Sequence, residues 1–157
     1  MRRKKVWEDP DYCLKAVKKD GWNLEYVKKQ TPEICVEAVK QNGFVLQLVK
    51  EKTVEVCLEA LKNKGSALKF IKHPTPEMLF EAVKNDEWVL QLIKKPTPEL
   101  CLEAVKQNWR VLKSIKHQTS EMIFEAVKQN NEAIRYIDRE IIFKCLDLWL
   151  DQENELV

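Results

Sequence analysis

Five cysteines are the most reactive side chains in this sequence, able in principle to act as metal ligands, nucleophiles or disulfide partners. Every separation between them is a multiple of 22 residues: Cys13, Cys35, Cys57, Cys101 and Cys145. This spacing predicts equivalent positions in a repeated unit, and such positions on packed helices lie about 8–10 Å apart. A disulfide needs Cα atoms within about 7 Å, and the sequence has no Cys-x-x-Cys pair of the zinc-binding kind. We therefore predict five reduced cysteines that act as small buried hydrophobic residues.

The histidines, serines and glutamates do not form a recognisable catalytic arrangement. His73 and His117 fall in repeats that are not adjacent, and the serines have no histidine and acid arranged around them. Glutamates recur in every unit, but Glu37 is followed three residues later by Lys40, a spacing typical of ion pairs on a solvated helix face. We therefore expect a protein that is not an enzyme, with no catalytic residue, metal site or cofactor.

Lysines and aromatic residues form the two recurring patterns that could bind a partner. One lysine recurs near the end of each 22-residue repeat, at Lys28, Lys50, Lys72, Lys94 and Lys116, and Asp138 ends the series. Aromatic residues recur near the middle of the repeat, at Trp22, Phe44, Trp88 and Trp109. A basic stripe beside aromatic rings can bind single-stranded nucleic acid. A structural role explains the same pattern, because lysines complement the negative end of a helix and aromatic rings can pack at a turn.

The candidate binding residues are those that vary while the repeated framework stays fixed. They are the bulky side chains at the turn and the lysines beside them: Trp88, Trp109, Arg110, Lys72, Lys94 and Lys116.

The elements that position these residues follow from the repeat itself. Windows of 22 residues begin at Asp9, Thr31, Thr53, Thr75, Thr97 and Thr119, and a partial one begins at Ile141. Thr at position 1 is a good N-cap, Pro at position 2 suits the first helical turn, and the apolar residues from position 4 to position 9 predict a helix buried on two sides. We expect Gly at position 13 to end this helix in a left-handed turn, and a second helix at about positions 14 to 21.

Two short helices cannot bury their own apolar faces, so neighbouring repeats must cover one another. We therefore predict an all-α protein, an α-solenoid of six 22-residue helix-turn-helix repeats plus a C-terminal capping helix. The prediction is a single domain over residues 1–157, with a basic N-terminal segment at 1–8, the repeats at 9–140 and the cap at 141–157.

Composition favours a folded chain in the cytoplasm. Hydrophobic residues make up 45% of the sequence and charged residues 33%. No apolar run approaches the roughly 20 residues of a membrane span, and no signal-peptide core follows the basic start. The net charge is only +2, but the first half of the repeats is acidic and the second half basic.

The motif "TPEICVEAVKQNG", followed by "VLQLVK", resembles a family of short tandem helical repeats catalogued as a domain of unknown function. That family is seen in bacteria, their mobile elements and large DNA viruses. The resemblance covers roughly residues 9–140, although Glu87, Trp109 and Asn131 replace the glycine in repeats four to six. The family carries no assigned activity, so the resemblance implies no residue role.

The function that we expect is therefore binding of a macromolecule, most simply another protein, through one face of the stack. An inhibitor or adaptor carried by a mobile element would be a special case. The alternative is nucleic-acid binding along the basic second-helix layer; the oligomeric state does not follow from the pattern.

Overall fold

The computed structural model describes residues 6–143 of the 157-residue chain, and every regular element in that range is an α-helix or a 3-10 helix. The α-helices are α2 (Pro10–Lys19), α3 (Pro32–Gln41), α4 (Val54–Asn63), α5 (Pro76–Asn85), α6 (Pro98–Gln107) and α7 (Ser120–Gln129). The 3-10 helices are η1 (Gly21–Tyr26), η2 (Gly43–Leu48), η3 (Gly65–Phe70), η4 (Glu87–Leu92), η5 (Trp109–Ser114) and η6 (Asn131–Tyr136). The all-α repeat architecture is thereby confirmed.

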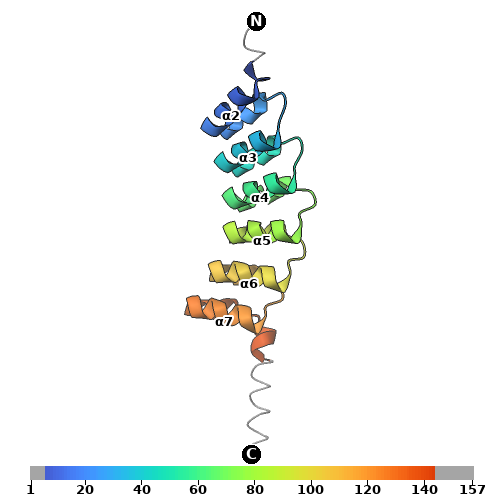
Figure 1. Ribbon diagram of the computed structural model, residues 1–157. Helices are drawn as coiled ribbons and strands as arrows, with labels where there is room; N and C mark the ends of the chain where they lie inside the picture. The colour runs from blue at the N-terminus through green and yellow to red at the C-terminus, as the bar shows by residue number, and fades with distance from the viewer. Residues whose placement is uncertain (1–5, 144–157) are drawn as a thin grey trace, which may run out of the picture. The chain divides into compact units, whose positions relative to one another are not determined.

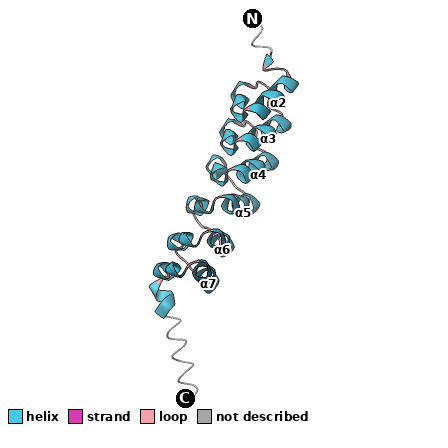
Figure 2. Cartoon of the chain, turned by 90° about the vertical axis from the view of Figure 1, so that its left-hand side faces the viewer, coloured by secondary structure: helices cyan, strands magenta, loops and turns pink. Residues whose placement is uncertain are grey.

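The elements group into two compact units, residues 1–94 and residues 95–157. Unit 1 contains α2 to η4 and unit 2 contains α6 to η6. Within each unit, successive α-helices pack on one another, and a 3-10 helix packs on the α-helix of its own repeat and on that of the next. Figure 1 shows α2, α3, α4 and α5 one below the other in unit 1, and Figure 2 shows that the α-helices of this unit lie on one side and its shorter helices on the other. The single domain over 1–157 stays a prediction. Residues 139–143 are helical, and the predicted capping helix at 141–157 lies outside the described residues from residue 144 onward.

Each α-helix begins as the sequence predicts. The threonine at position 1 accepts a hydrogen bond through Oγ1 from the backbone N–H three residues later, at 3.3–3.4 Å in all five threonine-capped repeats. Asp9 takes this role in the first repeat, where its carboxylate accepts from the N–H groups of Asp11 and Tyr12. These caps satisfy N–H groups that have no partner inside the helix.

The helix ends differ from the prediction. No described residue has a positive φ, glycine included, so the expected left-handed turn was wrong. Instead the residue at position 12 is extended, with φ −156° and ψ 113° at Asn42. Its side chain then caps the next element, because Asn42 Oδ1 accepts from the N–H of Phe44 at 3.0 Å. The second helix was also placed too late, since it is a 3-10 helix over positions 13 to 18 and ends before the lysine at position 20.

The glycine at position 13 is explained by packing. A Cβ atom on Gly43 would collide with the carbonyl oxygen of Ala60 and would lie 2.9 Å from Cβ of Lys64, both in the next repeat. Gly21 and Gly65 face Ala38 and Ala82 in the same way. Glycine therefore allows the 3-10 helix of one repeat to approach the α-helix of the next closely.

The core of each unit is built from the same positions in every repeat. Alanine at position 8 is fully buried in the second to sixth repeats: Ala38, Ala60, Ala82, Ala104 and Ala126. The cysteines at position 5 that the structure describes, Cys13, Cys35, Cys57 and Cys101, are buried and free, as predicted, and Cys145 lies outside the described residues.

No helix among the described residues has both the length and the apolar composition needed to cross a membrane.

Candidate functional site

The six candidate residues fall into two sets of three. Lys72, Trp88 and Lys94 belong to unit 1, and Trp109, Arg110 and Lys116 belong to unit 2. The candidate lysines and Arg110 are exposed, whereas Trp88 is 39% exposed and Trp109 only 7%. The two tryptophans therefore have different roles.

Trp109 is a packing residue of unit 2. Its ring lies 5.9 Å from that of Tyr136 between centroids, and the guanidinium of Arg110 lies 4.7 Å from its ring centroid. Its backbone N–H donates to Oε1 of Gln129 at 3.1 Å. An indole held in this way has little surface left for a partner.

Unit 1 presents a regular surface that depends on one backbone feature. The residue at position 19 is extended in each repeat, with φ −68° and ψ 119° at Val27 and φ −72° and ψ 122° at Val49. Successive side chains of extended backbone point to opposite sides. Val27 and Val49 are buried, so the residues before and after them, at positions 18 and 20, lie together on the other side: Lys28, Lys50 and Tyr26 are exposed, and Leu48 is half-buried and packs in part against the core.

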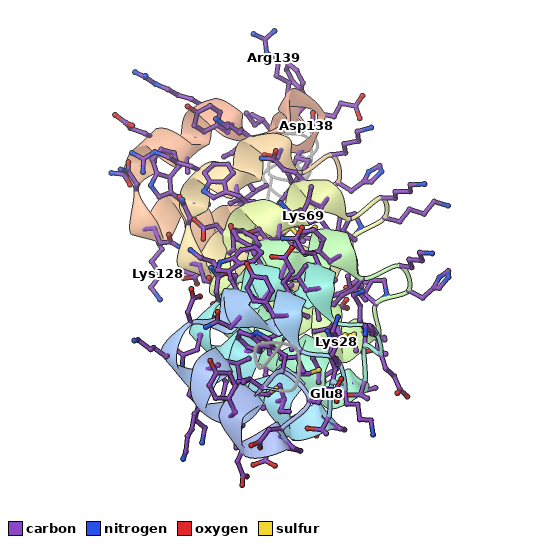
Figure 3. The ribbon with its side chains drawn as sticks, turned by 90° about the horizontal axis from the view of Figure 1, so that it is seen from above. Glu8, Lys28, Lys69, Lys128, Asp138 and Arg139 are labelled. Atoms are coloured by element: carbon purple, nitrogen blue, oxygen red, sulfur yellow. The ribbon has the colours of Figure 1, made fainter. Side chains whose placement is uncertain are left out.

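The result is an apolar residue beside a lysine in all four repeats of unit 1. We call these eight side chains the apolar–lysine face: Tyr26 and Lys28, Leu48 and Lys50, Phe70 and Lys72, Leu92 and Lys94. The four lysines are exposed, Tyr26 and Leu92 are 53% and 55% exposed, and Leu48 and Phe70 are half-buried. Figure 3 shows Lys28 on the side of the unit where the loops between repeats lie.

The aromatic residues at position 14 extend the apolar part of this face. The rings of Phe44 and Phe70 meet edge to face, with centroids 6.3 Å apart, so position 14 of one repeat reaches position 18 of the next. Lys69 Nζ lies 4.8 Å from the centroid of Phe44 and 5.0 Å from that of Phe70. Trp22, at the same position as Phe44, is 41% exposed and Trp88 is 39% exposed.

Hydrogen bonds hold neighbouring loops of the face in register. The side-chain amide of Gln30 donates through Nε2 to the carbonyl of Leu48 at 3.0 Å and accepts through Oε1 from the N–H of Lys50 at 2.9 Å. Lys50 Nζ in turn donates to the carbonyl oxygen of Lys28 at 3.4 Å. These contacts place the lysine-bearing loops of the first two repeats side by side.

The position-18 residues were missed by the sequence reasoning, although a signal for them exists. A second α-helix through positions 14 to 21 would place residues 18 and 20 about 200° apart around the helix axis, and therefore on different faces. Position 19 is β-branched in all four triplets, which read Tyr-Val-Lys, Leu-Val-Lys, Phe-Ile-Lys and Leu-Ile-Lys. Valine and isoleucine favour extended backbone over helix, so this position was the available signal.

Other kinds of site find little support in the described part of the chain. It contains no group of three or more metal-ligating side chains and no buried polar or charged residue. Burial raises the pKa of the thiols of Cys13, Cys35, Cys57 and Cys101, which disfavours the reactive thiolate. An open hollow of about 420 Å³ lies between the first turns of α2 and α3, lined by Pro10, Asp11, Leu14, Thr31, Pro32, Glu33 and Ile34.

The comparisons with known proteins identify a family. A domain of unknown function, DUF4116, matches residues 9–53 and residues 97–142. The chain belongs to the DUF4116 family. The comparisons with curated proteins and with solved structures gave no match.

The two DUF4116 segments each cover two consecutive repeats, one pair in unit 1 and one in unit 2. The third and fourth repeats, between these segments, keep the same 22-residue phase and the same helix bounds. The apolar–lysine face therefore extends from the DUF4116 segment of unit 1 into the following two repeats. The family description carries no activity, so the role of the face rests on its own chemistry.

Proposed function

We propose that this DUF4116 chain is a non-enzymatic module that binds another protein through the apolar–lysine face of unit 1. The observation that carries the proposal is the fourfold recurrence of an apolar side chain beside an exposed lysine, the apolar residue being exposed at Tyr26 and Leu92 and half-buried at Leu48 and Phe70. Exposed apolar rows rimmed by charge are typical of protein-binding surfaces. An adaptor and an inhibitor would both act through such a surface. The buried free cysteines fit a reducing compartment such as the cytoplasm.

Binding of single-stranded nucleic acid is the second candidate, favoured by the row of exposed lysines in the loops. It requires aromatic faces on which bases can stack. Lys69 lies over both Phe44 and Phe70, and Arg110 lies over Trp109, which is itself buried. Two of the position-18 residues, Leu48 and Leu92, are aliphatic. Exposed rings are present at Trp22, Tyr26 and Trp88, in the first and fourth repeats, but the second and third repeats between them present aromatic rings that Lys69 covers. This interruption favours apolar side chains of a protein over a continuous stack of bases.

An affinity capture with matched variants tests the proposal. The wild-type chain and a double variant of the full chain, Trp22→Ala with Leu92→Ser, are each used to capture proteins from extracts of the organism that encodes it. The captured proteins are compared, with and without nuclease treatment. Phe80→Ala is the control, because Phe80 is 43% exposed on α5 and lies outside the face. We expect one captured protein that survives nuclease, is retained by Phe80→Ala and is lost by the double variant. Truncation of a side chain that is a hot spot of an interface weakens the binding free energy by roughly 2 kcal/mol.

Two outcomes would contradict the proposal. Equal capture by wild type and by the double variant would place the binding surface elsewhere. A complex that nuclease abolishes, and whose affinity falls with salt at a log–log slope of about −0.7 per phosphate contact, would establish nucleic-acid binding instead.

A further inference from the structure

We propose that the partner of the apolar–lysine face is an acidic amphipathic helix that runs along unit 1 from repeat to repeat. This inference rests on the proposed function and specifies the chemistry of the partner. It is drawn from the charge of the face, from the side-by-side order of apolar and basic groups, and from the distance between repeats.

The charge of the face is the first argument. Lys28, Lys50, Lys72 and Lys94 are exposed, and Lys69 adds a cation over the aromatic pair. The ion pairs Glu37–Lys40 and Glu59–Lys62 lie on α3 and α4, and the lysines of the face take part in neither. The acidic side chains interspersed with them at positions 17 and 21 of unit 1 are Glu25 and Glu51, which leaves the surface basic. A basic surface favours an acidic partner and disfavours a basic one.

The order of groups within each repeat is the second argument. Val27, Val49, Ile71 and Ile93 are extended, and extended backbone places the residues before and after it on one side of the chain. The apolar residue at position 18, exposed at Tyr26 and Leu92 and half-buried at Leu48 and Phe70, therefore adjoins the exposed lysine at position 20. A partner must therefore offer a row of apolar side chains and, along one edge of it, a row of carboxylates. A helix with leucines on one face and glutamates beside them has this arrangement.

The distance between repeats is the third argument. Stacked helices lie about 8–10 Å apart, so the four apolar–lysine pairs recur at about this interval. Seven residues of an α-helix rise about 10.5 Å. A helix with a heptad repeat would therefore present successive heptads to successive pairs, and the three intervals between the four pairs correspond to about three heptads.

A set of synthetic peptides tests the inference with the full chain. The probe is a fluorescent helical peptide of about three heptads, with two leucines per heptad on one face and glutamates flanking them. One control peptide has glutamine at every glutamate, and another has lysine. Binding is measured by fluorescence anisotropy at low and at physiological salt, and a single-stranded oligonucleotide is measured in parallel.

We expect the glutamate peptide to bind about tenfold or more tightly than the glutamine peptide, with a difference that shrinks as salt rises. Lys50→Gln with Lys72→Gln should remove that difference. Lys40→Gln with Lys62→Gln, which makes the same change of charge on α3 and α4, should preserve it. Leu92→Ser should weaken the glutamate and glutamine peptides alike, because it removes an apolar contact that both peptides use.

The inference is overturned if the glutamine or lysine peptide binds as tightly as the glutamate peptide, or if the oligonucleotide binds more tightly than any peptide. These outcomes remain distinguishable from failure of the proposed function. If the captured protein is lost with Trp22→Ala and Leu92→Ser but kept with Lys50→Gln and Lys72→Gln, the face binds a protein without requiring an acidic one. If neither pair of variants affects capture, the proposed function has failed as well.

Discussion

Gly43 lies where the 3-10 helix of one repeat meets the α-helix of the next. The atom that excludes a side chain there is a backbone carbonyl oxygen, that of Ala60, which cannot swing aside as a flexible side chain can. Alanine at position 8 and glycine at position 13 therefore form one contact, since Ala60 is fully buried and its carbonyl faces the glycine.

Gly43→Ala should destabilise the chain by roughly 1–3 kcal/mol, the usual cost of overpacking a close contact. Asn131→Ala is the matched control, because Asn131 has the same position in the sixth repeat and is exposed. We expect it to change the free energy of unfolding by no more than about 0.5 kcal/mol. Both changes in the free energy of unfolding are measured by denaturant unfolding monitored with circular dichroism. Equal effects would show that the contact with Ala60 does not limit position 13.

The cysteines allow a second prediction at this scale. Desolvation raises the pKa of Cys13, Cys35, Cys57 and Cys101, and the carboxylate of Asp9 adds to the effect at Cys13 and that of Glu99 at Cys101. Because the pKa is higher in the folded state than in the unfolded state, the neutral thiols stabilise the fold below their ordinary pKa. This contribution is lost as the pH rises through the raised value.

Thiol labelling at pH 8 should therefore be slow in the native protein and fast in denaturant, since the thiolate is the reactive form. The measurement uses Cys145→Ser, so that only the four described cysteines are counted. Rapid labelling of several thiols without denaturant would contradict their burial.

At the scale of elements, side-chain amides join one repeat to the next. Gln30 bonds to the loop of the second repeat, and Gln118 does the same in unit 2, donating to the carbonyl of Tyr136 at 2.8 Å and accepting from the N–H of Asp138 at 3.0 Å. Asn63 reaches backward, donating to the carbonyl of Lys40 at 2.9 Å and accepting from the N–H of Gly43 at 2.8 Å. Such bonds satisfy backbone groups that the short helices leave without partners.

Gln30→Ala should lower the free energy of unfolding by about 1–3 kcal/mol, because it leaves the part-buried carbonyl of Leu48 without this donor and removes the exposed bond from the N–H of Lys50. Gln91→Ala is the control, since Gln91 is exposed on η4 and should change stability by less than about 0.5 kcal/mol. The comparison uses urea unfolding at constant pH. A loss no greater than that of the control would mean that water replaces the amide without cost.

The sequence predicted the α-helices closely because threonine caps and apolar periodicity are local signals. The second helix was harder, since six residues are too few to separate an α-helix from a 3-10 helix by periodicity. The cap of that helix was visible in Asp20, Asn42, Asp86, Asn108 and Asn130, which accept from the N–H two residues later at 2.8–3.2 Å. The burial of Trp109 could not be predicted, because it depends on Tyr136 and Gln129 in the next repeat, and pairing between repeats leaves no local pattern.

At the scale of the whole molecule, the core of each repeat is completed by apolar side chains of the neighbouring repeats. In unit 1, α3 packs on both α2 and α4, and α4 packs on both α3 and α5, whereas α3 is the α-helix on which α2 packs within residues 6–94. Ala16 of α2 is accordingly only half-buried, while Ala38 and Ala60 at the same position are fully buried. In repeat proteins, stability is approximately the sum of such nearest-neighbour contacts.

Amide hydrogen exchange should therefore show a gradient within unit 1. We expect the amides of α3 and α4 to exchange on the order of tenfold or more slowly than those of α2, because opening α2 breaks one helix–helix interface and opening α3 breaks two. Exchange is followed by mass spectrometry on peptides that cover α2, α3 and α4 separately. Gly43→Ala weakens the contact of η2 with α4 and should speed exchange in both elements more than in α2. Equal protection of α2, α3 and α4, with equal acceleration by the variant, would mean that unit 1 opens as one cooperative body and that the nearest-neighbour description does not apply.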